Sequence, residues 1–302
     1  MKARFSPVDL MLLGAILLWA LNLTVTRYVL THGFRPLAYA TTRYFAATAL
    51  FYCFTWQRER SFRIAVSDGK LAGLAGVLVF VNQVTFVLAL HRTTASSVGL
   101  LLGTTPIFVG VLATLVGLER LSRSFWLAAA ISFVGVGAIA AGGGSGLSGA
   151  VVGDLLAIGT AATWAAYSVA ITPLMRRYSP FRISALILGI GWVPLALVSI
   201  PELSRQGIDG FGWKMALAFG YAVIGPLFLT NILWFTAIAK VGPSRASLFA
   251  NLQPFIAVFF GLVLLSEHLN RWEVVGGVAI AGGIVLERWR RPVAQPLPVP
   301  AE

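Results

Sequence analysis

The chain carries one pattern twice, and this internal repeat constrains its fold more than any other feature. Pro106 and Glu119, thirteen residues apart, return as Pro254 and Glu267 at an offset of 148 residues. An earlier group returns at an offset of 145, with Asp9, Gly14 and Trp19 in the first copy and Asp154, Gly159 and Trp164 in the second. Self-similarity over this length indicates two fused, related halves.

Almost the whole chain is apolar. Hydrophobic residues make up 58% of the 302 residues and charged residues only 11%, against about 25% charged in a typical soluble domain. At about 20 apolar residues for each membrane-spanning helix, ten segments emerge: 8–26, 36–56, 70–90, 94–117, 124–141, 151–173, 181–200, 213–238, 244–265 and 272–289. Because the bilayer offers the backbone no water to bond, these segments have to be helices. The sequence therefore predicts an all-α integral membrane protein with ten transmembrane helices.

The basic residues indicate how the chain crosses the membrane. The two termini and the even-numbered loops carry 16 basic residues, whereas the odd-numbered loops carry 6. Because basic residues concentrate in cytoplasmic loops, this bias predicts that both termini lie in the cytoplasm. The net charge of +12 follows from the same bias. We therefore expect the lipid bilayer, and no nucleic acid, as a partner.

Each half holds five predicted helices, so the second half has to enter the membrane from the opposite side. The halves thus form an inverted repeat, which packs about a pseudo-two-fold axis in the membrane plane and is typical of secondary transporters that work by alternating access. We assign residues 1–141 to the first five-helix repeat, 142–150 to a Gly-rich linker, 151–291 to the second repeat and 292–302 to a Pro-rich cytoplasmic tail. The linker lacks the lysine of a phosphate-binding loop.

The N-terminus and the single cysteine exclude two other readings. Lys2 and Arg4 precede the first apolar run, as in a signal peptide. That run, however, exceeds the usual length of about 7–15 residues, and no clear cleavage site follows it. We interpret it as a retained helix. Cys53 has no second cysteine to pair with, so an intrachain disulfide or a thiolate metal cluster is excluded.

Each half also ends in the same way. A Pro-containing fourth helix ends in a Glu-x-Leu element, at Glu119 and Leu121 and again at Glu267 and Leu269, and a Gly-rich fifth helix follows. The glycines are Gly135, Gly137, Gly276, Gly277, Gly282 and Gly283. Over residues 8–289 the chain resembles the EamA family of the drug/metabolite transporter superfamily. The resemblance implies a carrier of the cell inner membrane, often an exporter of amino acids or other metabolites, with a cavity between the two halves.

Polar and aromatic residues recur three positions apart on four predicted helices. The pairs are Trp19/Asn22, Gln83/Phe86, Trp164/Tyr167 and Asn231/Trp234. Residues three apart share one helix face, and the repeat offsets relate the first pair to the third and the second to the fourth. Trp19 and Trp164 each lie about 15 Å beyond the acidic residue that opens their helix, near the bilayer middle. We expect the pairs to line a substrate cavity. The alternative is that the amides bond between helices and the aromatic rings only pack.

Two prolines and one arginine lie within the predicted spans. Pro106 and Pro254 would each remove a helical hydrogen bond and free a carbonyl, which could contact a ligand or give the helix a gating flexure. Arg43 lies about 10 Å of helical rise beyond Pro36. A charge at this depth has to snorkel, pair or face water. As a binding residue, Arg43 would attract a substrate carboxylate; as a structural residue, it would bond carbonyls or an interfacial phosphate.

The remaining polar residues indicate a structural role or no chemistry. Glu119 and Glu267 end their helices near the membrane surface, where we expect them to pair with Arg120, Arg123 or Arg271. Proton coupling is the alternative role of these glutamates. No acidic residue lies in the middle of a predicted span, so a buried proton relay has no support. No cluster has metal-ligand spacing, and no serine stands in a Gly-x-Ser-x-Gly element. We therefore expect no metal, no cofactor and no catalytic residue.

These features predict a transporter of small organic metabolites, and not an enzyme. Export of amino acids or related compounds comes from the family resemblance alone. The aromatic residues of the expected cavity suit an apolar or aromatic side chain. An intramembrane enzyme acting on a lipid-linked substrate is one alternative. A channel or passive scaffold is another, which the inverted repeat disfavours.

The charge bias generates a test of topology. A cysteine replacing Ser145, in the predicted linker, should react with an impermeant thiol reagent added outside intact cells. A cysteine replacing Arg60 should react only after the cells are permeabilised, because its loop carries several of the basic residues expected in the cytoplasm. The reverse labelling pattern would contradict the predicted orientation.

Overall fold

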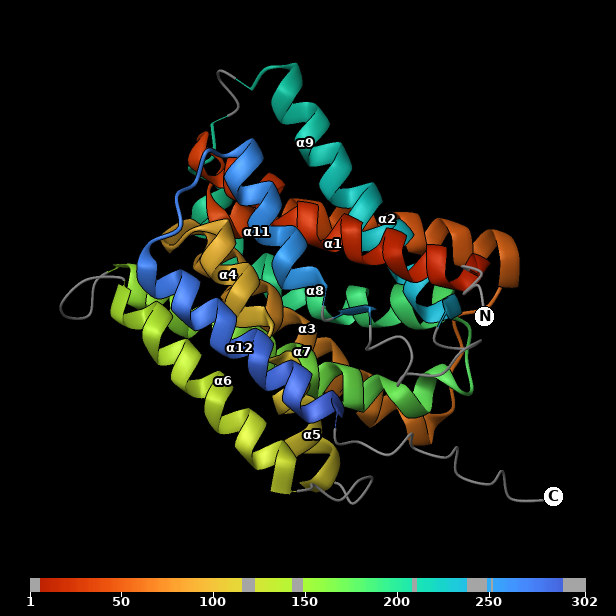
Figure 1. The fold of residues 1–302 in the computed structure, drawn as a ribbon. Coiled ribbons are helices and arrows are strands. Elements are labelled where there is room, and N and C mark those ends of the chain that lie inside the picture. Colours follow the sequence, from red (N-terminus) through yellow and green to blue (C-terminus); the bar gives the residue numbers. More distant parts are fainter. Residues whose placement is uncertain are drawn as a thin grey trace.

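The structure is a computed structural model that describes residues 6–115, 123–142, 149–207, 211–237, 249–250 and 252–289. Within these ranges the chain is helical and contains no strand, as the sequence predicts (Figure 1). The elements are α1 Pro7–Thr31, α2 Pro36–Glu59, α3 Val66–Arg92, α4 Ala95–Leu102, α5 Thr105–Leu115, α6 Arg123–Gly142, α7 Gly149–Met175, α8 Pro180–Leu203, α9 Trp213–Val223, η1 Ile224–Leu229, α11 Gln253–Leu264 and α12 Arg271–Trp289.

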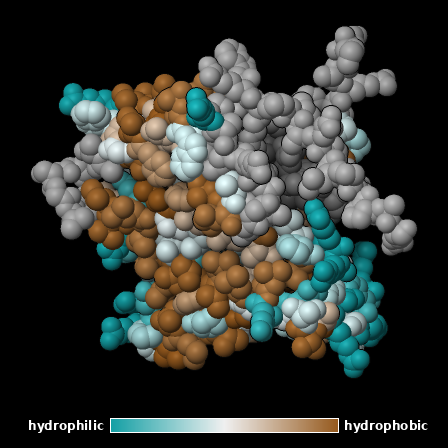
Figure 2. Space-filling view, turned by 90° about the horizontal axis from the view of Figure 1, so that it is seen from below, coloured by the Kyte–Doolittle hydropathy of each residue, from teal (hydrophilic) through white to brown (hydrophobic). Residues whose placement is uncertain are grey.

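The surface of the described helices is apolar, as a lipid-facing surface has to be. Within the described ranges, six segments are long and apolar enough to cross a membrane: Pro7–Thr31, Val66–Arg92, Ala95–Leu112, Ala150–Met175, Pro180–Leu203 and Trp213–Ala237. Figure 2 shows hydrophobic residues over much of one face, with hydrophilic residues gathered toward its margins. Large side chains such as Phe45, Leu197 and Leu217 are more than half exposed. Exposure of this kind is stable only against hydrocarbon. The chain is a multi-pass membrane protein.

Helices α2 and α8 pack antiparallel and cap each other. At one end, Glu59 of α2 accepts hydrogen bonds from the Ser179 hydroxyl and, at 2.9 Å, from Nε of Arg182 at the start of α8. At the other end, Glu202 of α8 accepts the backbone N–H of Leu37 in α2 at 2.6 Å. A carboxylate at a helix N-terminus satisfies free N–H groups and complements the helix dipole. Each helix of this equivalent pair thus brings a carboxylate to the start of the other, Glu202 to backbone N–H groups and Glu59 to side chains, as an inverted repeat predicts.

Helices α6 and α12 repeat this relation through small residues, and they lie side by side in Figure 1. Gly135 of α6 faces the backbone carbonyl of Gly276 in α12, so that a Cβ at Gly135 would lie 2.6 Å from that oxygen. Gly283 faces the backbone carbonyl of Ala128 at the same distance. The repeat offset of 148 residues relates Gly135 to Gly283 and Ala128 to Gly276, so the two contacts are equivalent. The expected fold of two inverted five-helix repeats is confirmed.

The fourth membrane span of the first half is divided into two helices. α4 ends at Leu102 and α5 begins at Thr105, so Pro106 is the second residue of a new helix. Pro254 is likewise the second residue of α11. We expected both prolines in a helix interior, and this prediction is wrong. Each proline lies in the first turn of a helix, where the backbone N–H has no intrahelical acceptor, so a proline there removes no hydrogen bond. The hydroxyls of Thr104 and Thr105 donate to carbonyls at the end of α4, at 2.7 and 2.6 Å, and so repair the break.

Among the described residues Glu267 forms no ion pair with an arginine, contrary to our prediction. Its carboxylate accepts the backbone N–H groups of Ala95 and Ser96, at 2.8 and 3.0 Å, at the start of α4. The first N–H groups of a helix have no intrahelical acceptor, so a carboxylate that accepts them stabilises the helix start. An ion pair with an exposed arginine contributes little by comparison. Glu119 lies outside the described residues. So do most of the predicted linker and the whole predicted tail, and the repeat boundaries stay predictions.

The contact between α6 and α12 generates a stability test. Gly135→Ala should lower the free energy of unfolding by about 1–3 kcal/mol, because the new methyl group meets a backbone carbonyl that cannot move aside. Gly137→Ala, two residues along the same helix, is the matched control: a Cβ there meets nothing within 4 Å. This control should be neutral or slightly stabilising. Equal stabilities of the two variants in thermal unfolding in detergent would contradict the packing.

Candidate functional site

Three tryptophans from distant parts of the chain meet between the halves. The ring centroids of Trp19 and Trp164 are 5.5 Å apart, and those of Trp19 and Trp234 are 5.1 Å apart. Tyr167 joins this group, with its centroid 5.3 Å from that of Trp164. The four residues, which we call the aromatic cluster, come from α1, α7 and the helix that follows η1. The rings pack at the tilted and edge-on angles that aromatic pairs favour.

A wide helical turn holds one wall of the aromatic cluster. Residues Ile224–Leu229 form a π-helix, and the carbonyl of Pro226 accepts the indole N–H of Trp19 at 3.3 Å. The Thr230 hydroxyl donates to the carbonyl of Gly225 at 3.0 Å. A proline supplies no N–H, so the helix widens there. Pro226 was not among the residues predicted to form the site, although a proline inside an apolar span could have indicated it.

Arg43 is buried among neutral polar partners. Only 1% of its surface is exposed. One terminal nitrogen donates to the amide oxygen of Asn22 at 3.2 Å, and the other donates to the amide oxygen of Gln83 at 2.6 Å. Its Nε has no hydrogen-bond partner among the described residues. The arginine therefore points into the protein between α1 and α3, and it does not snorkel to the interface.

Aromatic rings enclose the Arg43 guanidinium. Its central carbon lies 5.0 Å from the ring centroid of Tyr39, 5.7 Å from that of Tyr44 and 5.8 Å from that of Phe86. These distances are within the range of cation–π attraction. The polar and aromatic pairs predicted from the sequence to line the site include Phe86 but neither tyrosine. Tyr39 lies one helical turn before Arg43, and that spacing was the signal available.

The amide that receives Arg43 is itself held by a hydrogen-bond chain. The side-chain N–H group of Gln83 donates to Asn82 at 3.1 Å, and Asn82 donates to the carbonyl of Thr160 at 2.9 Å and to the hydroxyl of Thr163 at 3.2 Å. The chain joins α3 to α7 across the two halves. It orients the Gln83 oxygen toward the guanidinium. Asn82 is a second residue that the sequence pairs did not include.

The structure brings the sequence-predicted residues into two adjacent groups. The aromatic cluster holds Trp19, Trp164, Tyr167 and Trp234, and the group around Arg43 holds Asn22, Gln83 and Phe86. Asn22 lies one turn after Trp19 on α1 and so connects the groups. Asn231 donates to the carbonyl of Leu227 in its own helix, which leaves it outside the hydrogen bonds of Arg43.

The charge of Arg43 has no carboxylate to balance it within the described part of the chain. The ion pairs found there, Arg177–Asp68 and Arg182–Glu59, lie at helix ends. A buried cation without a counter-charge is costly in a membrane, and hydrogen bonds from neutral amides offset only part of that cost. The arrangement favours the entry of an anionic group. No group of three metal-ligating side chains occurs among the described residues.

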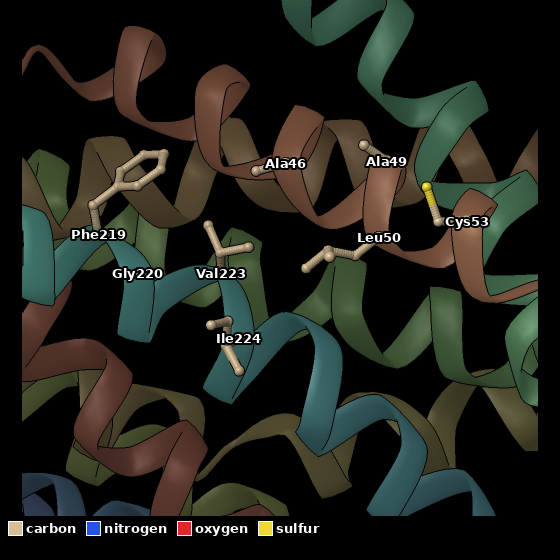
Figure 3. A pocket seen from close by; sticks show the side chains of 8 residues that line it. All are labelled: Ala46, Ala49, Leu50, Cys53, Phe219, Gly220, Val223 and Ile224. Carbon is tan, nitrogen blue, oxygen red and sulfur yellow. The ribbon is translucent and has the colours of Figure 1, made fainter.

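A separate hollow of about 360 Å³ lies between α2 and α9 (Figure 3). Its lining is apolar and consists of Ala46, Ala49, Leu50, Cys53, Phe219, Gly220, Val223 and Ile224. None of the sequence-predicted site residues lines it. It faces the outside of the bundle in the middle of two spanning helices, and its lining suits hydrocarbon.

Comparison with known proteins assigns the fold to a family. The model of the EamA-like transporter family matches residues 6–141 and again residues 151–287. The uncharacterized transporter YyaM of Bacillus subtilis is 25% identical over 92% of both chains. The uncharacterized transporter YetK of the same organism is 24% identical over 68% of this chain, and the match spans 63% of its own length. A solved crystal structure shares the fold, with a TM-score of 0.65, 19% identity and coverage of 94% of this chain and 99% of its own. With both halves matched, this membrane transporter belongs to the EamA-like transporter family.

Proposed function

We propose that this transporter exports amino acids or related small carboxylates with apolar or aromatic side chains, by alternating access across the cell inner membrane. Both termini lie in the cytoplasm in this proposal, as the charge bias predicts. The observation that carries the proposal is the uncompensated charge of Arg43 beside the aromatic cluster. The family supports transport of a small molecule, and the contacts around Arg43 support a carboxylate as the group that is recognised.

The guanidinium is arranged to receive a carboxylate. Asn22 and Gln83 fix its plane through the two terminal nitrogens, and Nε stays free to donate. Guanidinium and carboxylate match as planar groups with several parallel bonds, and a charged hydrogen bond of this kind contributes about 1.5–3 kcal/mol. A carboxylate would also neutralise the buried charge. Binding would therefore offset the electrostatic cost of burying this charge.

The aromatic cluster lies where the rest of such a substrate would extend. Asn22 at the Arg43 group and Trp19 at the aromatic cluster are one helical turn apart, about 5 Å of rise. That separation is comparable to the distance between the carboxylate and the side chain of an amino acid. Indole faces bind an apolar or aromatic group by burial and an ammonium group by cation–π attraction.

Reconstitution tests the proposed function directly. Purified protein in liposomes should exchange labelled apolar and aromatic amino acids across the membrane, measured as counterflow against a panel of metabolites. Decarboxylated or esterified analogues should compete poorly, because they cannot neutralise Arg43. Exchange of carboxyl-free metabolites in place of acids would contradict the proposal.

Arg43→Lys should weaken binding of carboxylated substrates by about tenfold or more, because lysine keeps the charge but loses the planar fork. Competition binding with an acid and its ester measures the effect, and the loss should be larger for the acid. An equal loss for acid and ester, together with poor expression, would assign Arg43 a purely structural role.

Trp164→Ala should lower the exchange rate of aromatic substrates more than that of small aliphatic ones, because it removes the ring that contacts both Trp19 and Tyr167. Trp213→Ala is the matched control, since Trp213 is 70% exposed at the start of α9. The control should keep wild-type rates in the same liposome assay. Identical rates for the two variants would mean that the aromatic cluster only packs.

A further inference from the structure

Two buried carboxyl groups, those of Asp154 and Glu273, lie beside the start of α4, where they contact Thr93 and Ser97. Asp154 lies near the start of α7 and is 3% exposed, and Glu273 lies near the start of α12 and is 6% exposed. Their charges are close enough to interact, and Asp154 also hydrogen-bonds the Thr93 side chain. α4 contacts both α7 and α12. All three helix starts belong to the face that carries the odd-numbered loops.

The two carboxyls differ in how their oxygens are used. Glu273 accepts the hydroxyl of Ser97 and, at 2.8 Å, the backbone N–H of Asn270. One oxygen of Asp154, Oδ1, is buried without any hydrogen-bond partner among the described residues. A charged carboxylate oxygen buried in this way is costly. A protonated carboxyl removes that cost, because the group is then neutral and can donate.

The surrounding charges do not neutralise the pair. Arg27 on α1 interacts with the neighbouring Glu267 and donates to the carbonyls at the end of α3. His91 and Arg92 end α3 with exposed side chains, and Arg271 stacks over Trp272. Neither Asp154 nor Glu273 takes part in an ion pair within the described residues. The N-terminal dipole of α4 stabilises one negative charge here better than two.

A proton fits this site better than a metal ion does. A hard cation such as Ca²⁺ takes six or more oxygen ligands, and smaller ions need nearly as many. Both oxygens of Glu273 are occupied, and Glu267 is fully engaged with α4. Of these three carboxyls, Asp154 alone has an oxygen, Oδ1, without a hydrogen-bond partner among the described residues. Two carboxyls whose charges interact are most stable together when one of them holds a proton.

The internal repeat of the sequence does not duplicate the pair. The counterpart of Asp154 at the offset of 145 is Asp9, and the counterpart of Glu273 at the offset of 148 is Phe125. Asp9 accepts the backbone N–H of Ser6 in a local cap. The repeat therefore keeps one carboxyl of the pair in sequence, at Asp9, and replaces the other by Phe125.

We propose that Asp154 and Glu273 form a proton-binding site that controls the opening of the odd-loop face. With one proton bound, the pair is singly charged and α4, α7 and α12 stay packed at their starts. When that proton leaves to water, two buried carboxylates repel and the three helix starts separate. Low pH at this face then favours the closed arrangement, and rising pH favours opening.

Infrared difference spectra test proton binding without any transport assay. The wild-type protein in lipid, compared between about pH 5 and pH 8, should show a carboxylic acid C=O band from a buried group. Asp154→Asn and Glu273→Gln should each diminish this band. Glu202→Gln is the matched control, because that glutamate lies on the same face and caps α2, and it should leave the band unchanged. A band that survives both test variants, or one that responds to Na⁺ at constant pH, would overturn the site.

Counterflow in liposomes tests the gate, and this part rests on the proposed function. Exchange by the wild-type protein should slow as the pH at the odd-loop face falls, whereas Asp154→Asn should be slow at every pH, because its pair cannot acquire the second charge. Exchange that is equally pH-dependent in that variant would overturn the gate. Absence of exchange by the wild-type protein at every pH would count against the proposed function and leave the infrared result standing.

Discussion

The ends of membrane helices have to find hydrogen-bond partners inside the protein, and the packing of this chain depends on how glutamates meet that need. Glu59 and Glu202 cap the two ends of the α2–α8 pair, and Glu267 caps α4. Each carboxylate comes from the opposite half, so the same bond that satisfies a helix end also joins the repeats. Loss of Glu202 or of Glu267 would leave two backbone N–H groups without their acceptor, which makes these two contacts strong constraints on packing. Glu59 instead binds the side chains of Ser179 and Arg182 at the start of α8.

Such bonds lie on both faces, and this limits how the halves can move. Glu59 with Ser179 lies on the even-loop face, where Asp68 also accepts Arg177 and Tyr178 at 2.7 and 2.8 Å. Glu202 and Glu267 act on the odd-loop face. Because α2 and α8 are bonded to each other at both ends, we expect them to move together. Bending should then cost least at the break between α4 and α5 and at the π-helix η1.

The sequence predicted the helices, the repeat and most of the residues that meet between the halves, because apolar length and internal offset are visible without coordinates. It did not predict the partners of Glu267, since an acceptor for free N–H groups is defined only once α4 is placed beside it. Tyr39 and Asn82 were missed for the same reason: each becomes part of the site through a neighbour on another helix. The prolines were misplaced because periodicity alone does not separate one kinked helix from two short ones.

The repeat is symmetric in its backbone but not in its site, and the asymmetry gives the site a direction. Asn22, Arg43 and Gln83 all belong to the first half, whereas the second half places Tyr167 at the counterpart of Asn22 and Leu188 at that of Arg43. The hydrogen bonds of Arg43 therefore come from the first half, and three of the four residues of the aromatic cluster, Trp164, Tyr167 and Trp234, come from the second. A carboxylate held by Arg43 would orient the remainder of a substrate toward Trp164 and Trp234, so that one molecule contacts both halves. Contact with both halves is what lets binding energy favour one relative position of the repeats over another.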